Sequence, residues 1–188
     1  GEGKGFENAV MMILGTGVGT AAYMDGKLVR GKHFQAGCIG GHFKIDIDGR
    51  NCGCGGKGCI EAYAGTWALK NVVSEDELFP ASGLSKEEKI DFMALEKWYK
   101  RKDPLAEKVF HECIKMFSTC AINLVHAYDP EVVIVSGGVM NFRDILAPLK
   151  SSIEKNIFTP WGIPEIRCSV NNQQSVLKGL HRFAELSI

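Results

Sequence analysis

The chain has 188 residues, enough for one domain with a sizeable core or for two small ones. Its hydrophobic content of 45% and charged content of 23% are those of an ordinary soluble globular protein. The 22 basic and 22 acidic side chains cancel, so the overall charge gives no attraction toward nucleic acid or an acidic membrane. No run approaches the roughly eighteen apolar residues of a membrane span, and no signal peptide opens the chain. We therefore predict a cytoplasmic protein with no membrane partner.

The first part of the chain predicts a β-meander. The apolar run Ala9–Leu14 is bounded by turn residues and is typical of a buried strand. A glycine-rich segment, Gly15–Gly19, follows, and a second strand is expected over Thr20–Met24. Asp25-Gly26 predicts a type I′ turn, which needs positive φ angles at both central positions, and leads to a third strand over Lys27–Arg30. The elements expected next are a short strand over 43–47 and a helix over 61–73.

Helical patterns dominate from Ser85 onward. Ser85 and Glu88 have the spacing of a capping box, in which hydroxyl and carboxylate satisfy free backbone amides at a helix start. The longest helix is expected to begin at Asp103-Pro104, where the missing N–H of proline costs nothing, and to end at Asp129-Pro130. Apolar residues recur along it at spacings of three and four and mark one buried face: Leu105, Val109, Cys113, Phe117, Cys120 and Leu124.

The β-branched run Val132–Val135 predicts a central parallel strand after this helix. Ser136-Gly137-Gly138 follows as a loop that opens onto another helix, expected to resume at Pro148. A last strand is expected over 166–170 and a final helix over 175–186. Strands first, and strand–helix alternation afterwards, predict an α/β fold.

One histidine and three cysteines, His42, Cys52, Cys54 and Cys59, lie within eighteen residues and are threaded by glycines that let the backbone turn tightly. Zinc prefers four soft or borderline ligands in a tetrahedron, and a Cys3His set satisfies it with no open position. Free thiols are the alternative. Disulfides fit poorly because three cysteines cannot all pair and the rest of the chain has an intracellular character. We therefore predict a structural zinc ion in the loop 42–61.

Two glycine-rich turns are candidates for binding an anion. Gly15–Gly19 offers bare backbone amides and the Thr16 hydroxyl, but a tight hairpin needs glycine for steric reasons alone, and no Walker sequence follows. Gly137-Gly138 follows a strand end, where ligands of open α/β sheets bind, but close strand–helix packing explains it equally well. Each turn taken alone leaves both interpretations open.

Taken together, in this order and spacing, these segments resemble the ROK family, which contains bacterial sugar kinases and sugar-responsive repressors. The segments that carry the resemblance span most of the chain: Leu14–Gly19, Asp25–Leu28, Gly41-His42, Cys52–Ala64 and Asp129–Val139. The resemblance implies an α/β, actin-like ATPase fold of the hexokinase and Hsp70 type. It would have a mixed sheet, flanking helices and a zinc-bound loop.

The resemblance also implies roles for individual residues. Gly15, Thr16, Gly17 and Gly19 would hold the phosphates of Mg-ATP, and Gly137 and Gly138 would lie against its adenosine. His42 would be a zinc ligand that also touches the sugar, and Glu61 would accept sugar hydroxyls. A simple negative charge at a helix N-terminus is the alternative role of Glu61.

Two departures from the family pattern limit these implications. The family's usual glutamate shortly before the histidine is replaced by Cys38 or Ile39, so the identity of the sugar cannot be carried over. The family's N-terminal half, with its phosphate loop and the aspartate that acts as general base, has no counterpart in residues 1–188. We therefore expect a C-terminal ROK domain with no catalytic residue of its own and a general base upstream of residue 1.

The sequence thus predicts part of an ATP-dependent kinase of a hexose or N-acetylhexosamine, inactive as this piece alone. The alternative is the sugar-sensing domain of a transcriptional repressor, which would contact nucleic acid through an upstream helix-turn-helix. The expected partners are the sugar, ATP, the N-terminal domain and further copies of the chain in a homo-oligomer.

Overall fold

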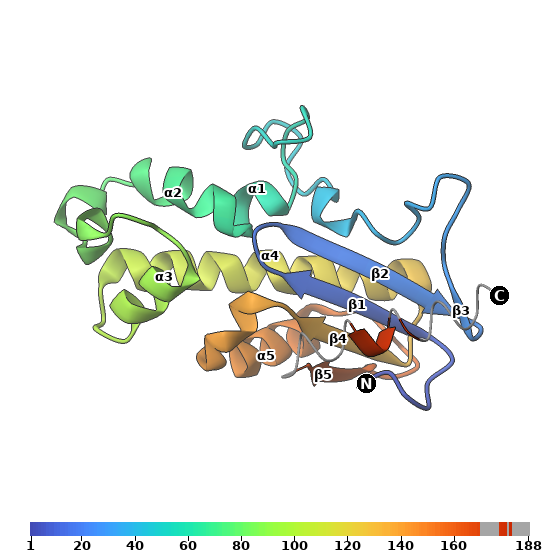
Figure 1. Ribbon diagram of the computed structural model, residues 1–188. Helices are drawn as coiled ribbons and strands as arrows, with labels where there is room; N and C mark the ends of the chain where they lie inside the picture. The colour runs from blue at the N-terminus through green and yellow to red at the C-terminus, as the bar shows by residue number, and fades with distance from the viewer. Residues whose placement is uncertain (170–176, 180, 182–188) are drawn as a thin grey trace.

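The computed structural model describes residues 1–169, 177–179 and 181. At its centre lies a sheet of β1 (Ala9–Leu14), β2 (Val18–Met24), β3 (Lys27–Leu28), β4 (Val132–Ser136) and β5 (Glu165–Cys168). The strand order is β3-β2-β1-β4-β5 (Figure 1). β1 pairs antiparallel with β2 and parallel with β4, and β4 pairs parallel with β5. The sheet is therefore mixed, and β1 and β4 end at the same edge.

The helices that pack around this sheet are α1 (Glu61–Ala64), α2 (Thr66–Ser74), α3 (Phe92–Tyr99), α4 (Pro104–Tyr128) and α5 (Leu146–Asn156). α4 runs behind the sheet with α5 beside it, and α1 and α2 follow each other along its other side (Figure 1). Among the described residues, no helix is both long enough and apolar enough to cross a bilayer.

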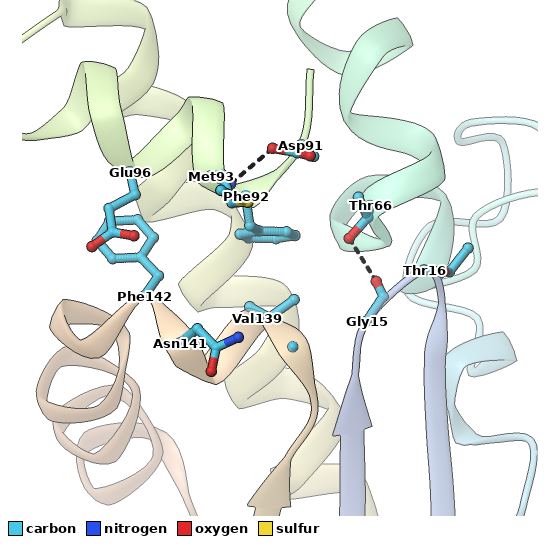
Figure 2. A pocket seen from close by; sticks show the side chains of 11 residues that line it. Gly15, Thr16, Thr66, Asp91, Phe92, Met93, Glu96, Val139, Asn141 and Phe142 are labelled. Carbon is cyan, nitrogen blue, oxygen red and sulfur yellow. Dashed lines mark hydrogen bonds between the residues drawn. The ribbon is translucent and has the colours of Figure 1, made fainter. Parts of the chain in front are cut away.

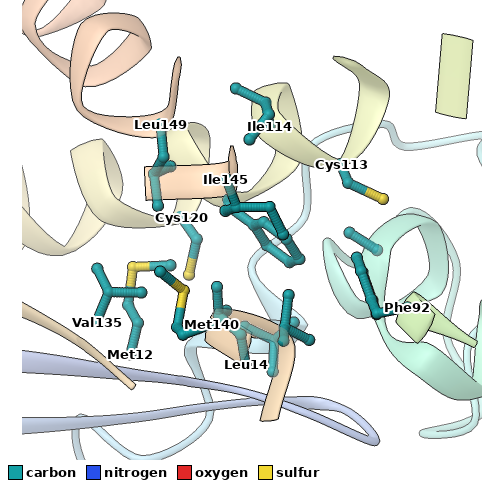
Figure 3. Packing of buried hydrophobic residues seen from close by; sticks show 14 of the residues in the cluster. Met12, Leu14, Phe92, Cys113, Ile114, Cys120, Val135, Met140, Ile145 and Leu149 are labelled. Atoms are coloured by element: carbon teal, nitrogen blue, oxygen red, sulfur yellow. The ribbon is translucent and has the colours of Figure 1, made fainter. Parts of the chain in front are cut away.

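The main core lies between the sheet and α4. β1 alternates, so that Val10, Met12 and Leu14 are buried in this core while Ile13 is partly exposed on the opposite face. The predicted apolar face of α4 is buried from end to end, and its two cysteines pack as small apolar groups. Figure 3 shows where the layers meet, through Met12, Leu14, Val135, Cys120, Met140, Ile145 and Leu149.

Several predicted elements are confirmed. Asp25 and Gly26 have φ angles of 51° and 72°, as a type I′ turn requires. β4 is a fully buried central strand with a parallel neighbour on each side. β2 begins at Val18, two residues before the predicted start, because Val18 and Gly19 pair with the end of β1. β3 is shorter than predicted.

The prediction of a helix capping box at Ser85 is wrong. Ser85 lies in a short 3-10 turn, and its hydroxyl donates to the Ser82 carbonyl at 2.8 Å instead of capping a helix. α3 begins at Phe92, because the Asp91 carboxylate accepts the N–H groups of Met93 (2.9 Å) and Ala94 (3.0 Å). The sequence offers several capping side chains here, and only their competing partners show which one starts the helix.

Two other elements, in and next to the loop 42–61, differ from the sequence prediction. The strand expected over Phe43–Ile47 is reduced to one isolated bridge, between Lys44 and Cys59, because the chain turns at Asp46. The helix expected over Glu61–Val73 is broken into α1 and α2 by Gly65, whose ψ angle of 143° is extended. The break frees the first N–H groups of α2 to bind the turn after β1.

The last predicted elements shift slightly. α5 begins at Leu146, two residues before Pro148. β5 covers Glu165–Cys168, whereas the end of the strand expected over 166–170 lies outside the described residues. Most of the helix expected over 175–186 lies outside them as well, and residues 177–179 and 181 are helical.

Asp103 ties the start of α4 to the turn before α3. Its carboxylate accepts the N–H groups of Ala106 (3.0 Å) and Gly83 (2.8 Å) and the hydroxyl of Ser82 (2.8 Å). Burial raises the pKa of this carboxyl, but the hydrogen-bond donors outweigh burial, and the pKa lies below its ordinary value.

Replacing Asp103 by alanine is therefore expected to lower the free energy of unfolding by about 1–2 kcal/mol, since loss of an N-cap side chain costs about that much. Because the folded pKa is depressed, the contribution is complete above the ordinary carboxyl pKa and is lost as pH falls through the folded value. Urea denaturation at neutral and acid pH checks both points. Glu88→Ala, an exposed side chain near the same turn, is the control and should change little.

Candidate functional site

The four predicted metal ligands come together in the loop that stands out from the domain beside α1 (Figure 1). The ligand atoms of His42, Cys52, Cys54 and Cys59 all lie within 4.8 Å of one another. Nδ1 of His42 is 3.6 Å from Sγ of Cys52, and Sγ of Cys54 is 3.7 Å from Sγ of Cys59. This His/Cys cluster could hold a metal ion.

The electrostatics of the cluster are uneven. Burial raises the pKa of the Cys52 thiol to about 11, whereas the N–H of Gly56 lowers the pKa of the exposed Cys54 thiol. The Lys44 ammonium donates to Sγ of Cys59 at 3.1 Å and to the Lys57 carbonyl at 2.5 Å. A cation thus lies beside the most buried sulfur, where it would offset the negative charge of coordinated thiolates.

The turn Gly15–Gly17 between β1 and β2 is fixed by the start of α2. Thr66 donates its N–H (3.2 Å) and its hydroxyl (2.7 Å) to the Gly15 carbonyl, and the N–H of Trp67 donates to the Thr16 carbonyl at 3.1 Å. Inside the turn, the N–H of Gly15 donates to the Gly17 carbonyl at 3.0 Å. These bonds hold the predicted phosphate-binding turn in one conformation.

Glu61 reaches the other side of the same turn. Its Oε2 accepts the N–H of Val18 at 2.8 Å, and its Oε1 accepts the indole N–H of Trp67 at 3.1 Å. A Cβ at Gly17 would overlap the Glu61 carboxylate in its present position, so glycine lets the turn lie directly against this carboxylate. Glu61 is therefore more than a helix-terminal charge, because it connects the metal-ligand loop to the turn after β1.

A cleft of about 440 Å³ opens beyond the ends of β1 and β4, where ligands of α/β sheets commonly bind (Figure 2). Three residues predicted to bind ATP line it: Gly15, Thr16 and Gly138. The opposite wall comes from α3 and from the turn after β4, through Asp91, Phe92, Met93, Glu96, Val139, Asn141 and Phe142.

The other predicted ATP residues lie outside this cleft. Gly17 contacts Glu61, and Gly19 is paired with Ile13 inside the sheet. Gly137 has a φ angle of 105°, and a Cβ there would overlap the Leu14 carbonyl. Its glycine therefore permits a close approach to the end of β1, a contact between strand ends and not the strand–helix packing that the sequence offered as the alternative.

Sequence reasoning missed the far wall of the cleft and the residues at the start of α2 that hold the turn after β1 and Glu61. Asp91, Glu96 and Asn141 lie far along the chain from Gly15 and follow no recognisable spacing, so only the fold brings them opposite the turn. Thr66 and Trp67 carried a weak signal. Gly65 precedes them inside a predicted helix, and an interior glycine marks a possible break.

The mixed sheet, its flanking helices and the cleft at its edge define an actin-like α/β domain. The family model described as "ROK family" matches residues 1–185, and the chain belongs to the ROK family. The family and the fold class predicted from the sequence are therefore confirmed.

The chain is 28% identical over 186 residues to the N-acetylgalactosamine kinase AgaK of Shewanella sp., covering 95% of this chain and 58% of that protein. Among solved structures, it resembles a ROK family glucokinase from Streptomyces griseus in complex with glucose and AMPPNP. The TM-score is 0.73 and the identity 27%, over 88% of this chain and 56% of that one. It also shares its fold with a ROK family transcriptional regulator, a homologue of the E. coli MLC protein. There the TM-score is 0.72 and the identity 24%, over 86% and 41% of the two chains. The chain spans about half the length of the curated relatives it matches.

Proposed function

We propose that this chain is the C-terminal part of an ATP-dependent kinase whose acceptor is a hexose or an N-acetylhexosamine. The observation that carries the proposal is the double contact of the turn after β1. On one side, Gly15 and Thr16 line the cleft with Gly138; on the other, Gly17 and Val18 contact Glu61. If the cleft takes the nucleotide and Glu61 the sugar, donor and acceptor meet at this turn, as phosphoryl transfer requires.

The chemistry of the cleft suits Mg-ATP. Met93 offers exposed apolar surface for the adenine beside the largely buried Phe92, Val139 and Phe142, and the amide of Asn141 offers hydrogen bonds to the base or ribose. The N–H groups of Gly15 and Val18 are already bonded within the protein. The phosphates would therefore be held by the amide and the hydroxyl of Thr16, with Mg²⁺ offsetting their charge.

Zinc is the metal that the His/Cys cluster fits best. Tetrahedral zinc with bonds of about 2.3 Å to sulfur and about 2.1 Å to nitrogen places two sulfurs about 3.8 Å apart and a sulfur and a nitrogen about 3.6 Å apart. The Cys54–Cys59 and His42–Cys52 separations of 3.7 Å and 3.6 Å match these values. Four protein ligands leave no open position, so the ion would be structural, and Lys44 would offset the net negative charge of three thiolates.

His42 and Glu61 are the proposed sugar ligands in this chain. With Nδ1 of His42 directed at the metal cluster, Nε2 remains for a sugar hydroxyl. The position of the missing family glutamate is taken by Cys38, which is half-buried, or Ile39, which is 53% exposed. Neither side chain can accept a hydroxyl as a carboxylate does, so the sugar is held by His42, Glu61 and residues from outside the chain.

Replacing Glu61 by glutamine is expected to weaken sugar binding by about 1–3 kcal/mol in the full-length protein, because a buried hydroxyl loses its charged acceptor. Calorimetric titration with hexoses and N-acetylhexosamines measures the effect, and circular dichroism checks that the fold is retained. Glu75→Gln, on the exposed ion pair with Arg50, is the matched control. Equal affinities of wild type and Glu61→Gln would return Glu61 to a purely structural role.

The sugar-sensing domain of a repressor is the alternative function, and it would use the same sugar residues without turnover. The likeness to the transcriptional regulator extends to the fold alone. Any sequence that precedes Gly1 in the full-length protein would discriminate the two, because a helix-turn-helix ahead of a sugar-kinase half favours the repressor.

A further inference from the structure

Trp67 lies where the proposed sugar-binding carboxylate is held. Its indole N–H donates to Oε1 of Glu61 at 3.1 Å, and the backbone N–H of Val18 donates to Oε2 at 2.8 Å. Each carboxylate oxygen thus has one fixed donor, and the carboxylate plane cannot rotate without breaking one of the two bonds. Each oxygen keeps further acceptor capacity for a ligand hydroxyl.

The backbone at Trp67 is fixed independently of its ring. The N–H of Trp67 donates to the Thr16 carbonyl, and both bonds of Thr66 go to the Gly15 carbonyl. The Trp67 side chain is 37% exposed and lies outside the main core. A change of the ring alone therefore leaves the turn after β1 and the apolar core in place.

We propose that Trp67 is a positioning residue, whose indole N–H sets the direction in which Glu61 presents its acceptor sites to the sugar. The inference rests on the proposed sugar-binding role of Glu61. The family's other sugar-binding glutamate is replaced here by Cys38 or Ile39, and this supports the inference. A site with fewer carboxylate acceptors depends more on the orientation of Glu61. Trp67 acts through Glu61 and needs no contact with the sugar.

The pair is tested first without any sugar, by the indole N–H resonances of ¹⁵N-labelled protein. The sequence has three tryptophans, and Trp67→Phe identifies the resonance of Trp67. Glu61→Gln should shift this resonance. The chain offers a matched pair elsewhere, in which the indole N–H of Trp98 donates to Glu87 at 2.7 Å. Glu87→Gln should move the Trp98 resonance and leave that of Trp67 in place. If Glu61→Gln leaves the chemical shift of the Trp67 resonance unchanged, the hydrogen bond between Trp67 and Glu61 is contradicted.

The functional arm uses calorimetry on the full-length protein, with any residues that precede Gly1. Trp67→Phe should weaken sugar binding about fivefold to tenfold, the cost of one typical intramolecular hydrogen bond, and change the affinity for an ATP analogue less than about twofold. Trp98→Phe removes the same kind of bond away from the site and should change neither affinity. If wild type binds the sugar and Trp67→Phe binds it with the same affinity, the positioning role is overturned and the proposed function is not. A wild type that binds no sugar overturns the proposed function and the positioning role together.

Discussion

Replacing Cys54 by serine is expected to remove the bound metal and to unfold the loop 42–61. Cys54 is the exposed cysteine of the cluster, and serine differs from it by one atom, so little packing is lost. Cys52 and Cys59 are buried, and their replacement would mix a packing loss with the loss of the metal. Cys54→Ser therefore isolates the contribution of the ion.

The size of the effect follows from how little apolar packing holds the part of the loop that carries the cysteines, since Phe43, Ile45 and Ile60 anchor only its two ends in the main core. Cys52, Cys59 and Ala62 form a small apolar cluster with Tyr63, separate from the main core. Structural zinc contributes about 10–16 kcal/mol in small peptides, so we expect the free energy of opening the loop to fall by about 3 kcal/mol or more. The sheet should persist, because the main core beneath it does not depend on the metal, and Ile60 at the end of the loop remains packed in that core. Glu61, the next residue, would lose its defined position.

Metal analysis and hydrogen exchange on the same samples check this prediction. Wild type should carry about one zinc ion per chain, and its loop amides should be protected. Cys54→Ser should lose both the metal and the protection. Cys38→Ser changes a cysteine outside the cluster and should keep them. A wild type purified without chelators that holds almost no zinc would contradict the metal assignment, and a fully protected loop in Cys54→Ser would contradict its structural role.

The parts of the fold that the sequence predicted well are those with a strong local cause. The apolar run of β1, the β-branched run of β4 and the Asp103-Pro104 start of α4 each specify one element with little competition. The failures occur where several local signals compete. Ser85 has the spacing of a cap, but its hydroxyl bonds to Ser82, and the helix begins after Asp91.

The candidate site divides in the same way. The four ligands of the metal cluster are predictable because they lie close together in sequence and metal chemistry restricts their residue types. The wall formed by Asp91, Glu96 and Asn141 is not, because any polar residue could stand at these positions and the cleft exists only after α3 has packed opposite β1. The bond from Trp67 to Glu61 depends on the break at Gly65, which a periodic helical pattern conceals.

Residues 1–188 alone are expected to show no phosphoryl transfer to any hexose or N-acetylhexosamine. In this chain the turn after β1 has the proposed nucleotide residues on one side and Glu61 on the other, and we propose that the general base on the acceptor hydroxyl lies in the preceding half of the protein. A general base typically contributes about a hundredfold to ten-thousandfold to the rate. The larger loss is orientation, because the reactants of a two-domain kinase are aligned only when a cleft closes around both.

An ADP-release assay on this chain, repeated with the preceding half of the protein restored, measures the prediction. The panel should include glucose, N-acetylglucosamine and N-acetylgalactosamine, because the replacement of the family glutamate by Cys38 or Ile39 leaves the sugar open. Nucleotide binding by the chain alone should be weak, since we expect the preceding half of the protein to cover the open side of the cleft lined by Gly15, Thr16 and Gly138. Lack of turnover in the isolated chain is informative only if the restored protein is active, so both are assayed at equal zinc occupancy.

The three possible results separate the competing functions. Turnover only after restoration selects the kinase, because it places the missing base and the second wall of the sugar site in the preceding half. Sugar binding without turnover in the restored protein favours the repressor, since Glu61 and His42 can recognise a sugar whether or not phosphate is transferred. Turnover by residues 1–188 alone would contradict the proposal at its root. A base would then have to be sought among the carboxylates that line the cleft, beginning with Glu96, whose partner Lys100 lies 2.5 Å away.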